Sequence, residues 1–266
     1  MEERRSNIKK KYPDKIRRSA GRAINRYGMI QGGDRVAVAV SGGKDSCVLL
    51  EILATRRKHM PVSYEVLPVH VTVRGIPASS KPAHLSGLCS ELGLSLHELT
   101  AGPEIIPVHG ESVCFKCTQS RRRELFSFCR DHGCNRLAFG HHMDDTLETL
   151  LMSMAFNGSI SALPPRLPIF SGKLDIIRPL ILIPERDINE YALIRGFPVQ
   201  GNSCPHGLDS SREAVRGIIN GLEKVNRGAR KNLFRSLSNI HYDYLPGNVD
   251  TDPGVHDPDF SEGFPL

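Results

Sequence analysis

One stretch constrains the fold of this chain more than any other: Val36 to Ser46 reads VAVAVSGGKDS. Its first five residues are small, apolar and rich in β-branched side chains, which is typical of a strand buried on both faces of a parallel sheet. Ser41-Gly42-Gly43 then breaks the strand, and Asp45-Ser46 can cap a helix that follows. Such a turn predicts an anion site, because backbone N–H groups and the positive end of the helix dipole converge there.

Strand and helix patterns alternate over most of the chain. The alternation favours parallel βαβ units and therefore an α/β fold: a doubly wound, mostly parallel sheet of about five strands, with extra N- and C-terminal helices. We start the second strand at Val69, because Pro68 cannot donate a hydrogen bond to a neighbouring strand. The predicted strands cover residues 36–40, 69–73, 94–99, 136–139 and 174–177, and the predicted helices cover 15–27, 47–53, 80–92, 118–132, 146–156, 184–194, 211–225 and 230–240.

A second turn, GHHMDD over 140–145, also follows a predicted strand. It is expected beside the SGGKDS loop at the carboxyl edge of the sheet, where such folds bind ligands. Asp144 and Asp145 begin a helix, so they either cap it or hold Mg²⁺ or orient a base. His141 and His142 are adjacent and their side chains diverge, so we expect at most one to reach a given ion.

Charge is unevenly distributed and distinguishes the two ends of the chain. Residues 1–26 carry ten Lys/Arg against three Asp/Glu, whereas residues 247–266 carry five Asp/Glu and no Lys/Arg. A basic segment of this density suits a phosphate backbone, and a solvated helix face explains it equally well. The predicted segments are a basic helical arm over 1–30, an α/β nucleotide-binding domain over 31–200, a helical segment over 201–245 and a flexible acidic tail over 246–266.

The sequence argues against a membrane or exported protein. No apolar run approaches the roughly 20 residues that span a membrane, and the N-terminus lacks the apolar core of a signal peptide. Seven cysteines, an odd number, indicate reduced thiols and a cytoplasmic location. Four of them are expected to be small buried hydrophobic residues: Cys47, Cys89, Cys129 and Cys134.

Cys114 and Cys117 form a CxxC pair that can grip a metal ion or two irons of a cluster. A helix is predicted to begin just after them, and its N-terminus favours thiolates. Cys204, in a tight polar turn, is the natural third ligand. Three thiols would leave one cluster iron open, whereas His206 would complete a closed zinc site; the residues alone leave these alternatives balanced.

SGGKDS differs from the common P-loop, which has glycine where Val38 stands and Ser/Thr where Asp45 stands. It resembles the pyrophosphate loop of the ATP pyrophosphatase (PP-loop) superfamily, which has the adenine nucleotide alpha hydrolase-like fold. Those enzymes cleave ATP between the α and β phosphates and adenylate a carbonyl-type oxygen. A carboxylate beside a pyrophosphate is repulsive unless a cation lies between them, so Asp45 implies Mg²⁺.

Several motifs in matching order resemble the tRNA 2-thiocytidine synthetase (TtcA) family, over roughly residues 15–245. They are SGGKDS, CFKC at 114–117 followed by TQSRRRELF, GHHMDDTLETLL at 140–151, Arg178-Pro179-Leu180 and Cys204. The resemblance implies ATP-dependent replacement of the C2 oxygen of cytidine 32 in tRNA by sulfur. It also implies ATP as substrate, a [4Fe-4S] cluster on Cys114, Cys117 and Cys204, and a cysteine desulfurase or other sulfur donor as partner.

The expected site residues follow from these motifs. Asp45, Asp144 and Asp145 are the expected catalytic carboxylates, and Asp45 is also the expected Mg²⁺ ligand. The arginines expected to bind tRNA are Arg17, Arg18, Arg121, Arg122 and Arg123, of which the last three stand near a helix N-terminus where stability does not favour positive charge. The expected ATP ligands are Ser41, Gly42, Gly43, Lys44, Asp45, Ser46, His70, Gly140 and His141.

Two departures from the family pattern keep alternatives open. Gly207 stands where some members have a further cysteine, and the loop over 100–113 is short. The alternatives are a related 2-thiouridine synthetase, which usually carries more CxxC pairs, a lysidine-type ligase or amide-forming synthetase of the same superfamily, and a non-enzymatic, zinc-stabilised RNA-binding protein. The sequence leaves the oligomeric state open, and a homodimer is compatible with it.

Overall fold

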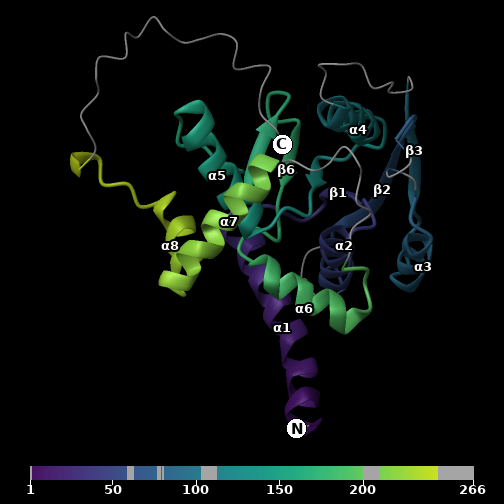
Figure 1. Cartoon of the computed structure of the whole chain (residues 1–266). Coiled ribbons are helices and arrows are strands. Elements are labelled where there is room, and N and C mark those ends of the chain that lie inside the picture. The colour runs from purple at the N-terminus through teal and green to yellow at the C-terminus, as the bar shows by residue number, and fades with distance from the viewer. Residues whose placement is uncertain are drawn as a thin grey trace, which may run out of the picture. The chain divides into compact units, whose positions relative to one another are not determined.

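The main element of the protein is a sheet of six strands, as far as the described residues show, in the order β3-β2-β1-β4-β6-β5. Figure 1 shows a computed structural model of the chain, coloured along the sequence. It describes residues 2–58, 63–76, 79, 81–102, 113–199 and 210–244. The strands are β1 (Arg35–Ala39), β2 (Glu65–Val73), β3 (His97–Ala101), β4 (Arg136–Ala138), β5 (Arg166–Ile169) and β6 (Leu174–Ile177).

The sheet is mostly parallel, which confirms the predicted fold class. β1 pairs in parallel with β2 and with β4, and the parallel pairing continues to β3 on one side and to β6 on the other. The strand order reverses between β1 and β4, because the chain first builds outward through β2 and β3 and then returns. Right-handed crossovers on either side of such a reversal place their helices on opposite faces of the sheet.

The second strand begins earlier than predicted, at Glu65 rather than Val69. The N–H of Glu65 donates to the carbonyl of Asp34 at 2.9 Å, so every second N–H of this strand points toward β1. By that alternation, the missing N–H of Pro68 falls on the other side, where β3 begins to pair only from Val69. Pro68 is therefore tolerated in the strand, and the prediction that it would delay the strand was wrong.

The sequence did not predict β5, because no strand or helix was predicted between residues 157 and 173. It pairs antiparallel with β6 at the edge of the sheet. Phe170 and Ser171, with positive φ values of 50° and 56°, form the turn that connects the two strands. Four residues that include Pro168 give little strand signal, but an edge strand accepts a proline because one side has no neighbour.

Helices cover the sheet in two groups. α1, α2 and α6 pack together, and α2 packs on β1 and β2, whereas α4 packs on β2 and β3. The helices are α1 (Glu2–Arg26), α2 (Lys44–Arg56), α3 (His84–Glu91), α4 (Val113–Asp131), α5 (Met143–Asn157), α6 (Glu185–Arg195), α7 (Ser210–Val225) and α8 (Ala229–Ser236), with a 3-10 turn over Tyr242–Tyr244 (Figure 1).

The basic N-terminal helix is anchored by the apolar face that its sequence predicts. Ile16, Ala20 and Ile24 are buried. Tyr12 donates from its hydroxyl to Asp187 of α6 at 2.6 Å, and the Lys15 ammonium lies 3.0 Å from the other oxygen of that carboxylate. Burial, followed by the hydrogen bond to Asp187, raises the pKa of Tyr12 above its usual range. These contacts bind the second half of α1 to the helices beside the sheet.

The chain forms two compact units. The first comprises residues 1–146 and 164–209 and contains the sheet; the second comprises 147–163 and 210–266. In the second unit, the buried carboxylate of Glu148 lies 2.8 Å from the Arg216 guanidinium, and Val215 and Ile219 of α7 are buried. Among the described residues, no helix combines the length and apolar character needed to cross a membrane.

Candidate functional site

Two turns meet where the strand order of the sheet reverses. β1 and β4 are neighbours, and the SGGKDS loop follows β1 while the GHHMDD turn follows β4. Both turns therefore lie at the carboxyl ends of parallel strands, at the point where ligands bind in open α/β sheets. This position identifies the reversal between β1 and β4 as the candidate site.

The buried side chain of Ser46 stabilises the SGGKDS loop through hydrogen bonds to its backbone. Its hydroxyl accepts a hydrogen bond from the Gly42 N–H at 3.1 Å and donates to the Gly43 carbonyl at 2.9 Å. The Ser41 hydroxyl lies 3.2 Å from that of Ser46 and accepts from the Gly43 N–H. Gly43 is the N-cap of α2, so the prediction that Asp45 and Ser46 cap this helix was wrong; both lie in its first turn.

Two glycines allow backbone to approach the loop closely. Gly42 has φ +85°, and a Cβ there would lie 2.3 Å from the ring of Pro82. At Gly140, a Cβ would lie 3.0–3.2 Å from the backbone of Asp45 and Ser46. A side chain at Gly42 would push away the segment before α3, and a side chain at Gly140 would push the two turns apart.

Lys44 and Asp45 form a charged pair at the start of α2. The Lys44 ammonium lies 3.2 Å from Asp45 and 3.0 Å from Glu185, the first residue of α6. Burial opposes the charge on Lys44, but Asp45 and Glu185 outweigh it and raise the pKa of Lys44. Burial raises the pKa of Asp45, although His142 and Lys44 partly offset this effect. One carboxylate oxygen of Asp45, Oδ1, is buried without a hydrogen-bond partner.

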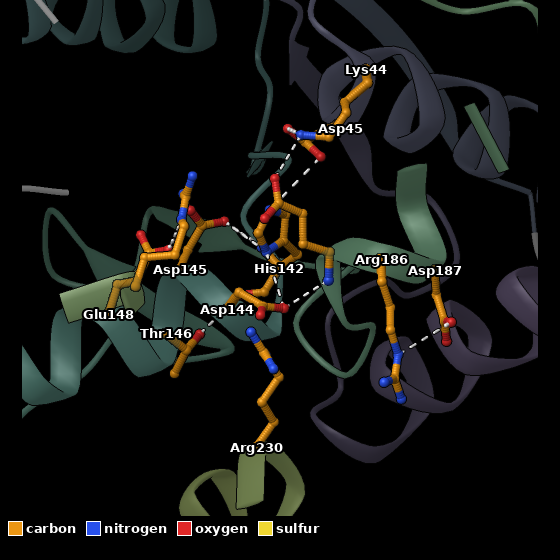
Figure 2. A network of polar contacts seen from close by, with 12 residues as sticks. Lys44, Asp45, His142, Asp144, Asp145, Thr146, Glu148, Arg186, Asp187 and Arg230 are labelled. Carbon is orange, nitrogen blue, oxygen red and sulfur yellow. Dashed lines mark hydrogen bonds and ion pairs between the residues drawn. The ribbon is translucent and has the colours of Figure 1, made fainter. Parts of the chain in front are cut away.

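His142 connects the two turns, as Figure 2 shows. Its Nε2 lies 3.8 Å from Oδ1 of Asp45, and its Nδ1 lies 3.3 Å from Asp145 and 4.0 Å from Asp144. The sequence named His141 as the ATP ligand and did not select His142. The argument that adjacent histidines diverge was sound, but nothing in the sequence indicated which of the two turns inward.

The carboxylates of Asp144 and Asp145 each accept a backbone hydrogen bond at the N-terminus of a helix. Oδ2 of Asp145 accepts from the His142 N–H at 2.8 Å, which caps α5. Oδ2 of Asp144 accepts from the Glu185 N–H at 2.7 Å, which caps α6. The predicted capping of α5 is therefore realised by Asp145, whereas Asp144 caps α6 instead. These hydrogen bonds fix two carboxylates beside the SGGKDS loop, because α5 and α6 begin there.

The two histidines expected to bind ATP have different surroundings. His70 is buried, and both of its ring nitrogens lie against backbone carbonyls, those of Val40 at 2.7 Å and Ser79 at 3.1 Å. His141 is half-buried, and its Nδ1 accepts a hydrogen bond from Arg178 at 3.3 Å. His70 thus supports the strand end before Ser41, whereas His141 lies at the surface of the turn.

The CxxC pair lies inside α4 rather than before it, because this helix begins at Val113 and not near Thr118 as predicted. Cys114 and Cys117 are half-buried, and their spacing of three residues places them on one face of the first turns. The thiols therefore fit a pair of ligands to one metal group, beside a helix N-terminus that favours thiolates. Cys204, His206 and Gly207 lie outside the described residues.

The four remaining cysteines are buried, as predicted. Burial raises the pKa of the Cys47 thiol to about 12 and that of Cys89 to about 11. Such thiols are protonated at neutral pH and unsuited to binding a metal. Cys129 and Cys134 form a buried pair at the end of α4, in which the hydrogen bond to Cys134 raises the pKa of Cys129.

The arginines expected to bind tRNA lie on two helices, α1 and α4. Arg122 is half-buried and close enough to lower the pKa of Arg178, whereas Arg123 lines a cavity of about 750 Å³. This cavity lies at the opposite, amino-terminal edge of the strands, because it is also lined by the residues just before β4 and the β5–β6 turn. Arg17 lies 3.8 Å from Glu51, and Arg18 is exposed.

Comparison with known proteins gives consistent matches over most of the chain. A family model described as a PP-loop domain matches residues 13–222. A tRNA-cytidine(32) 2-sulfurtransferase from Geobacter sulfurreducens is 39% identical over 237 residues, which cover 87% of this chain and 91% of that protein. A protein of the same name from Pseudomonas fluorescens is 35% identical over 238 residues, covering 86% of this chain and 85% of its own length.

Among solved structures, the U34-tRNA thiolase NcsA from Methanococcus maripaludis, with its [4Fe-4S] cluster, is similar in fold. Its TM-score is 0.71 at 23% sequence identity, and the match covers 91% of this chain and 85% of that chain. At this level of identity the likeness shows a shared fold. The sequence matches have higher identity, 39% and 35%, and they establish the family to which the chain belongs.

Proposed function

The chain belongs to the PP-loop domain family and, within it, to the tRNA-cytidine(32) 2-sulfurtransferases, and on this basis we propose how its residues share the reaction. The activity is ATP-dependent thiolation of tRNA, in which sulfur replaces the C2 oxygen of cytidine 32. One ATP and one sulfur atom at the oxidation level of sulfide give 2-thiocytidine, AMP and pyrophosphate.

The first step joins AMP to the base. The C2 oxygen of cytidine attacks the α-phosphorus of ATP, and pyrophosphate leaves. The SGGKDS loop is the proposed cradle for the pyrophosphate, because Gly42 and Gly43 allow a close approach and α2 begins there. Lys44 would exchange its carboxylate partners for phosphate oxygens, which offsets the charge that develops on the leaving group.

Asp45 is the proposed ligand for Mg²⁺ on the ATP. The buried Oδ1 of Asp45 has no hydrogen-bond partner, and a hard oxygen donor of this kind suits the ion. When bound, Mg²⁺ supplies the positive charge that lets a carboxylate lie beside phosphates. Asp144 and Asp145 are proposed to orient the cytidine or the metal-bound nucleotide, a task that suits groups held firmly at two helix starts.

In the second step, sulfur adds to C2 and AMP leaves with the former cytidine oxygen. Cys114 and Cys117 fit one metal group, and with Cys204 they are the proposed holders of a [4Fe-4S] cluster. When bound, a cluster with three protein ligands supplies an iron with an open position for sulfur. The two thiols lie on one helix face, so α4 fixes their separation before a metal arrives.

The remaining partners follow from this chemistry. Arg17, Arg18, Arg121, Arg122 and Arg123 are proposed contacts for the tRNA phosphate backbone, which basic side chains bind without regard to sequence. A cysteine desulfurase or another sulfur donor is the proposed source of sulfur. A desulfurase delivers sulfur as a persulfide, so a thiol reductant must then supply two electrons to bring it to the level of sulfide. A cytoplasmic location is proposed because reduced thiols persist there. A homodimer is the oligomeric state that we propose to test first.

One observation supports this division of roles: the two strand-end turns are in contact, and Lys44, Asp45 and His142 belong to one network of polar contacts (Figure 2). A nucleotide held on the first turn would therefore meet the carboxylates of the second turn. The contact depends on Gly140, whose backbone packs on that of Asp45.

The test is a reconstituted reaction. Chain purified without oxygen and loaded with iron and sulfide is incubated with MgATP, a sulfide source and tRNA lacking the modification. We expect AMP and pyrophosphate in step with 2-thiocytidine, measured by mass spectrometry of the digested tRNA. A tRNA with uridine at position 32 is the control and should gain no 2-thiocytidine. AMP formation without sulfur incorporation would contradict the proposal, and so would a single bound zinc in place of iron.

A further inference from the structure

Arg178 is a buried cation whose position stability does not explain. It follows β6 and is fully buried. Nη1 donates to the Pro164 carbonyl at 2.7 Å, but Nη2 has no hydrogen-bond partner. Burial, followed by the charge of Arg122, lowers the pKa of Arg178 to about 10, with Asp145 as the opposing charge. An apolar side chain of similar size would avoid the cost of burying this charge, so stability alone gives little reason for an arginine here.

The third guanidinium nitrogen of Arg178, Nε, determines which tautomer the His141 ring adopts. Nε of Arg178 lies 3.3 Å from Nδ1 of His141. A guanidinium nitrogen can only donate, so Nδ1 must accept with its lone pair. In the neutral ring, the proton is then on Nε2, and a second proton on Nδ1 would face the donor directly. The contact therefore selects one tautomer and opposes the charged form of His141.

The selected tautomer has a place in the candidate site. His141 follows Gly140, whose backbone packs on Asp45 and Ser46 of the SGGKDS loop. The Phe139 ring stacks on the imidazole with a centroid distance of 5.6 Å, which limits rotation of the ring. The ring is thus held in one orientation and one protonation state, half-buried at the edge of the turn.

We propose that Arg178 is a positioning residue for the nucleotide site: it holds His141 as a neutral Nε2–H donor for an acceptor oxygen of the bound adenine nucleotide. The proposal deepens the proposed function and rests on it, because it takes His141 to be an ATP ligand. It assigns Arg178 no contact with the nucleotide itself. The charged groups beside Arg178 are Arg122 of α4 and Asp145 of α5.

The first test reads the tautomer without any reaction. In protein labelled with ¹⁵N-histidine, long-range ¹H–¹⁵N spectra distinguish the Nε2–H from the Nδ1–H ring, and His141→Gln identifies the His141 signals by their loss. We expect His141 of the unaltered protein to be Nε2–H, and Arg178→Met to populate the Nδ1–H or charged form. Arg166→Met is the matched control, because Arg166 pairs with Asp175 and not with His141; its His141 signals should match the unaltered protein.

The second test asks whether Arg178 acts through His141. Binding of MgATP without tRNA is measured for Arg178→Met, His141→Gln and the double variant, with thermal unfolding to confirm that each folds. Each single variant should weaken binding by about tenfold, the effect of one hydrogen bond. The double variant should be no weaker than His141→Gln alone. Arg178→Lys keeps one donor and should recover part of the affinity.

The outcomes separate the inference from the proposed function. An Nδ1–H ring in the unaltered protein, or Nε2–H signals unchanged in Arg178→Met, would overturn the positioning role even if thiolation is normal. Effects of the two single variants that multiply in the double variant would overturn it too, because Arg178 would then act independently. If the unaltered protein fails to bind MgATP at all, the proposed function fails, while the spectra still report on the tautomer.

Discussion

Asp45 is a half-buried carboxylate whose negative charge the folded state does not favour. Because burial raises its pKa above the usual 3.8, the folded state disfavours the charged form. Asp45→Asn should therefore raise the melting temperature at neutral pH, measured by calorimetry. The gain should fade as the pH falls toward 3.8, where the unaltered carboxyl is itself protonated. Binding of MgATP should weaken by at least roughly tenfold, since even outer partners of metal sites contribute that much.

Gly42 tests the shape of the loop. Gly42→Ala should lower stability by about 1–2 kcal/mol from its left-handed backbone alone, because φ is +85°. A Cβ at 2.3 Å from Pro82 adds a shift of the loop, so MgATP binding should weaken as well. Gly43→Ala is the matched control for stability: its φ is −72° and its Cβ would make an ordinary contact at 3.5 Å. Equal urea midpoints for the two variants would contradict this account.

At the scale of single residues, the sequence predicted which motifs converge but not which atoms meet. SGGKDS and GHHMDD are recognisable because glycines and carboxylates follow apolar strands. The inward turn of His142, the pairing of Lys44 with Glu185 and the contact of Arg178 with His141 depend on residues far apart in the chain. Their partners are set by tertiary packing, which a single sequence does not encode locally.

At the scale of elements, one buried arginine joins the amino ends of β4 and β6 to the turn before β1. Nη1 of Arg136 lies 2.6 Å from Asp175, and its Nε lies 3.1 Å from Asp34. Arg136→Met leaves two buried carboxylates without this cation, so unfolding in urea should become easier by about 3–5 kcal/mol. Arg130→Met removes an exposed pair with Asp131 and should change the urea midpoint by no measurable amount.

A second prediction at the scale of elements concerns the CxxC pair in the first turns of α4. Cys114→Ser and Cys117→Ser should each remove most of the iron and acid-labile sulfide found after anaerobic loading, because each loses one of the proposed ligands. Cys89→Ala, which alters a buried cysteine away from the pair, should retain both. Full iron content in either CxxC variant would refute the assignment of these thiols.

The sequence predicted most elements because their periodicity is strong, and its errors share a cause. Pro68 and β5 were misjudged because a proline's effect depends on whether the strand has a neighbour on that side. The start of α4 was placed after the CxxC pair, although cysteine and lysine give no signal against a helix there. Pairing partners and helix ends are properties of the assembled sheet.

At the scale of the whole molecule, the excess of positive charge in α1 predicts how the chain attracts tRNA. Deleting residues 2–10 removes Arg4, Arg5, Lys9 and Lys10 but keeps the contacts of Tyr12 and Lys15 with Asp187. The truncated chain should keep its melting temperature but bind tRNA more weakly at low salt. The slope of log affinity against log salt should fall by up to about 3. An unchanged slope would mean that this segment does not contact phosphate.

The pairing of Lys44 with Asp45 and Glu185 makes nucleotide arrival an exchange of ions. If the ammonium turns to a phosphate, the half-buried carboxylate of Asp45 loses a counter-charge and faces the anion that displaced it. Only a divalent cation can then supply the positive charge that Asp45 has lost. Metal and nucleotide should therefore each tighten the other's binding by the same factor. Metal-free ATP should therefore bind weakly, and the protein should transfer no AMP from a nucleotide that arrives without its ion.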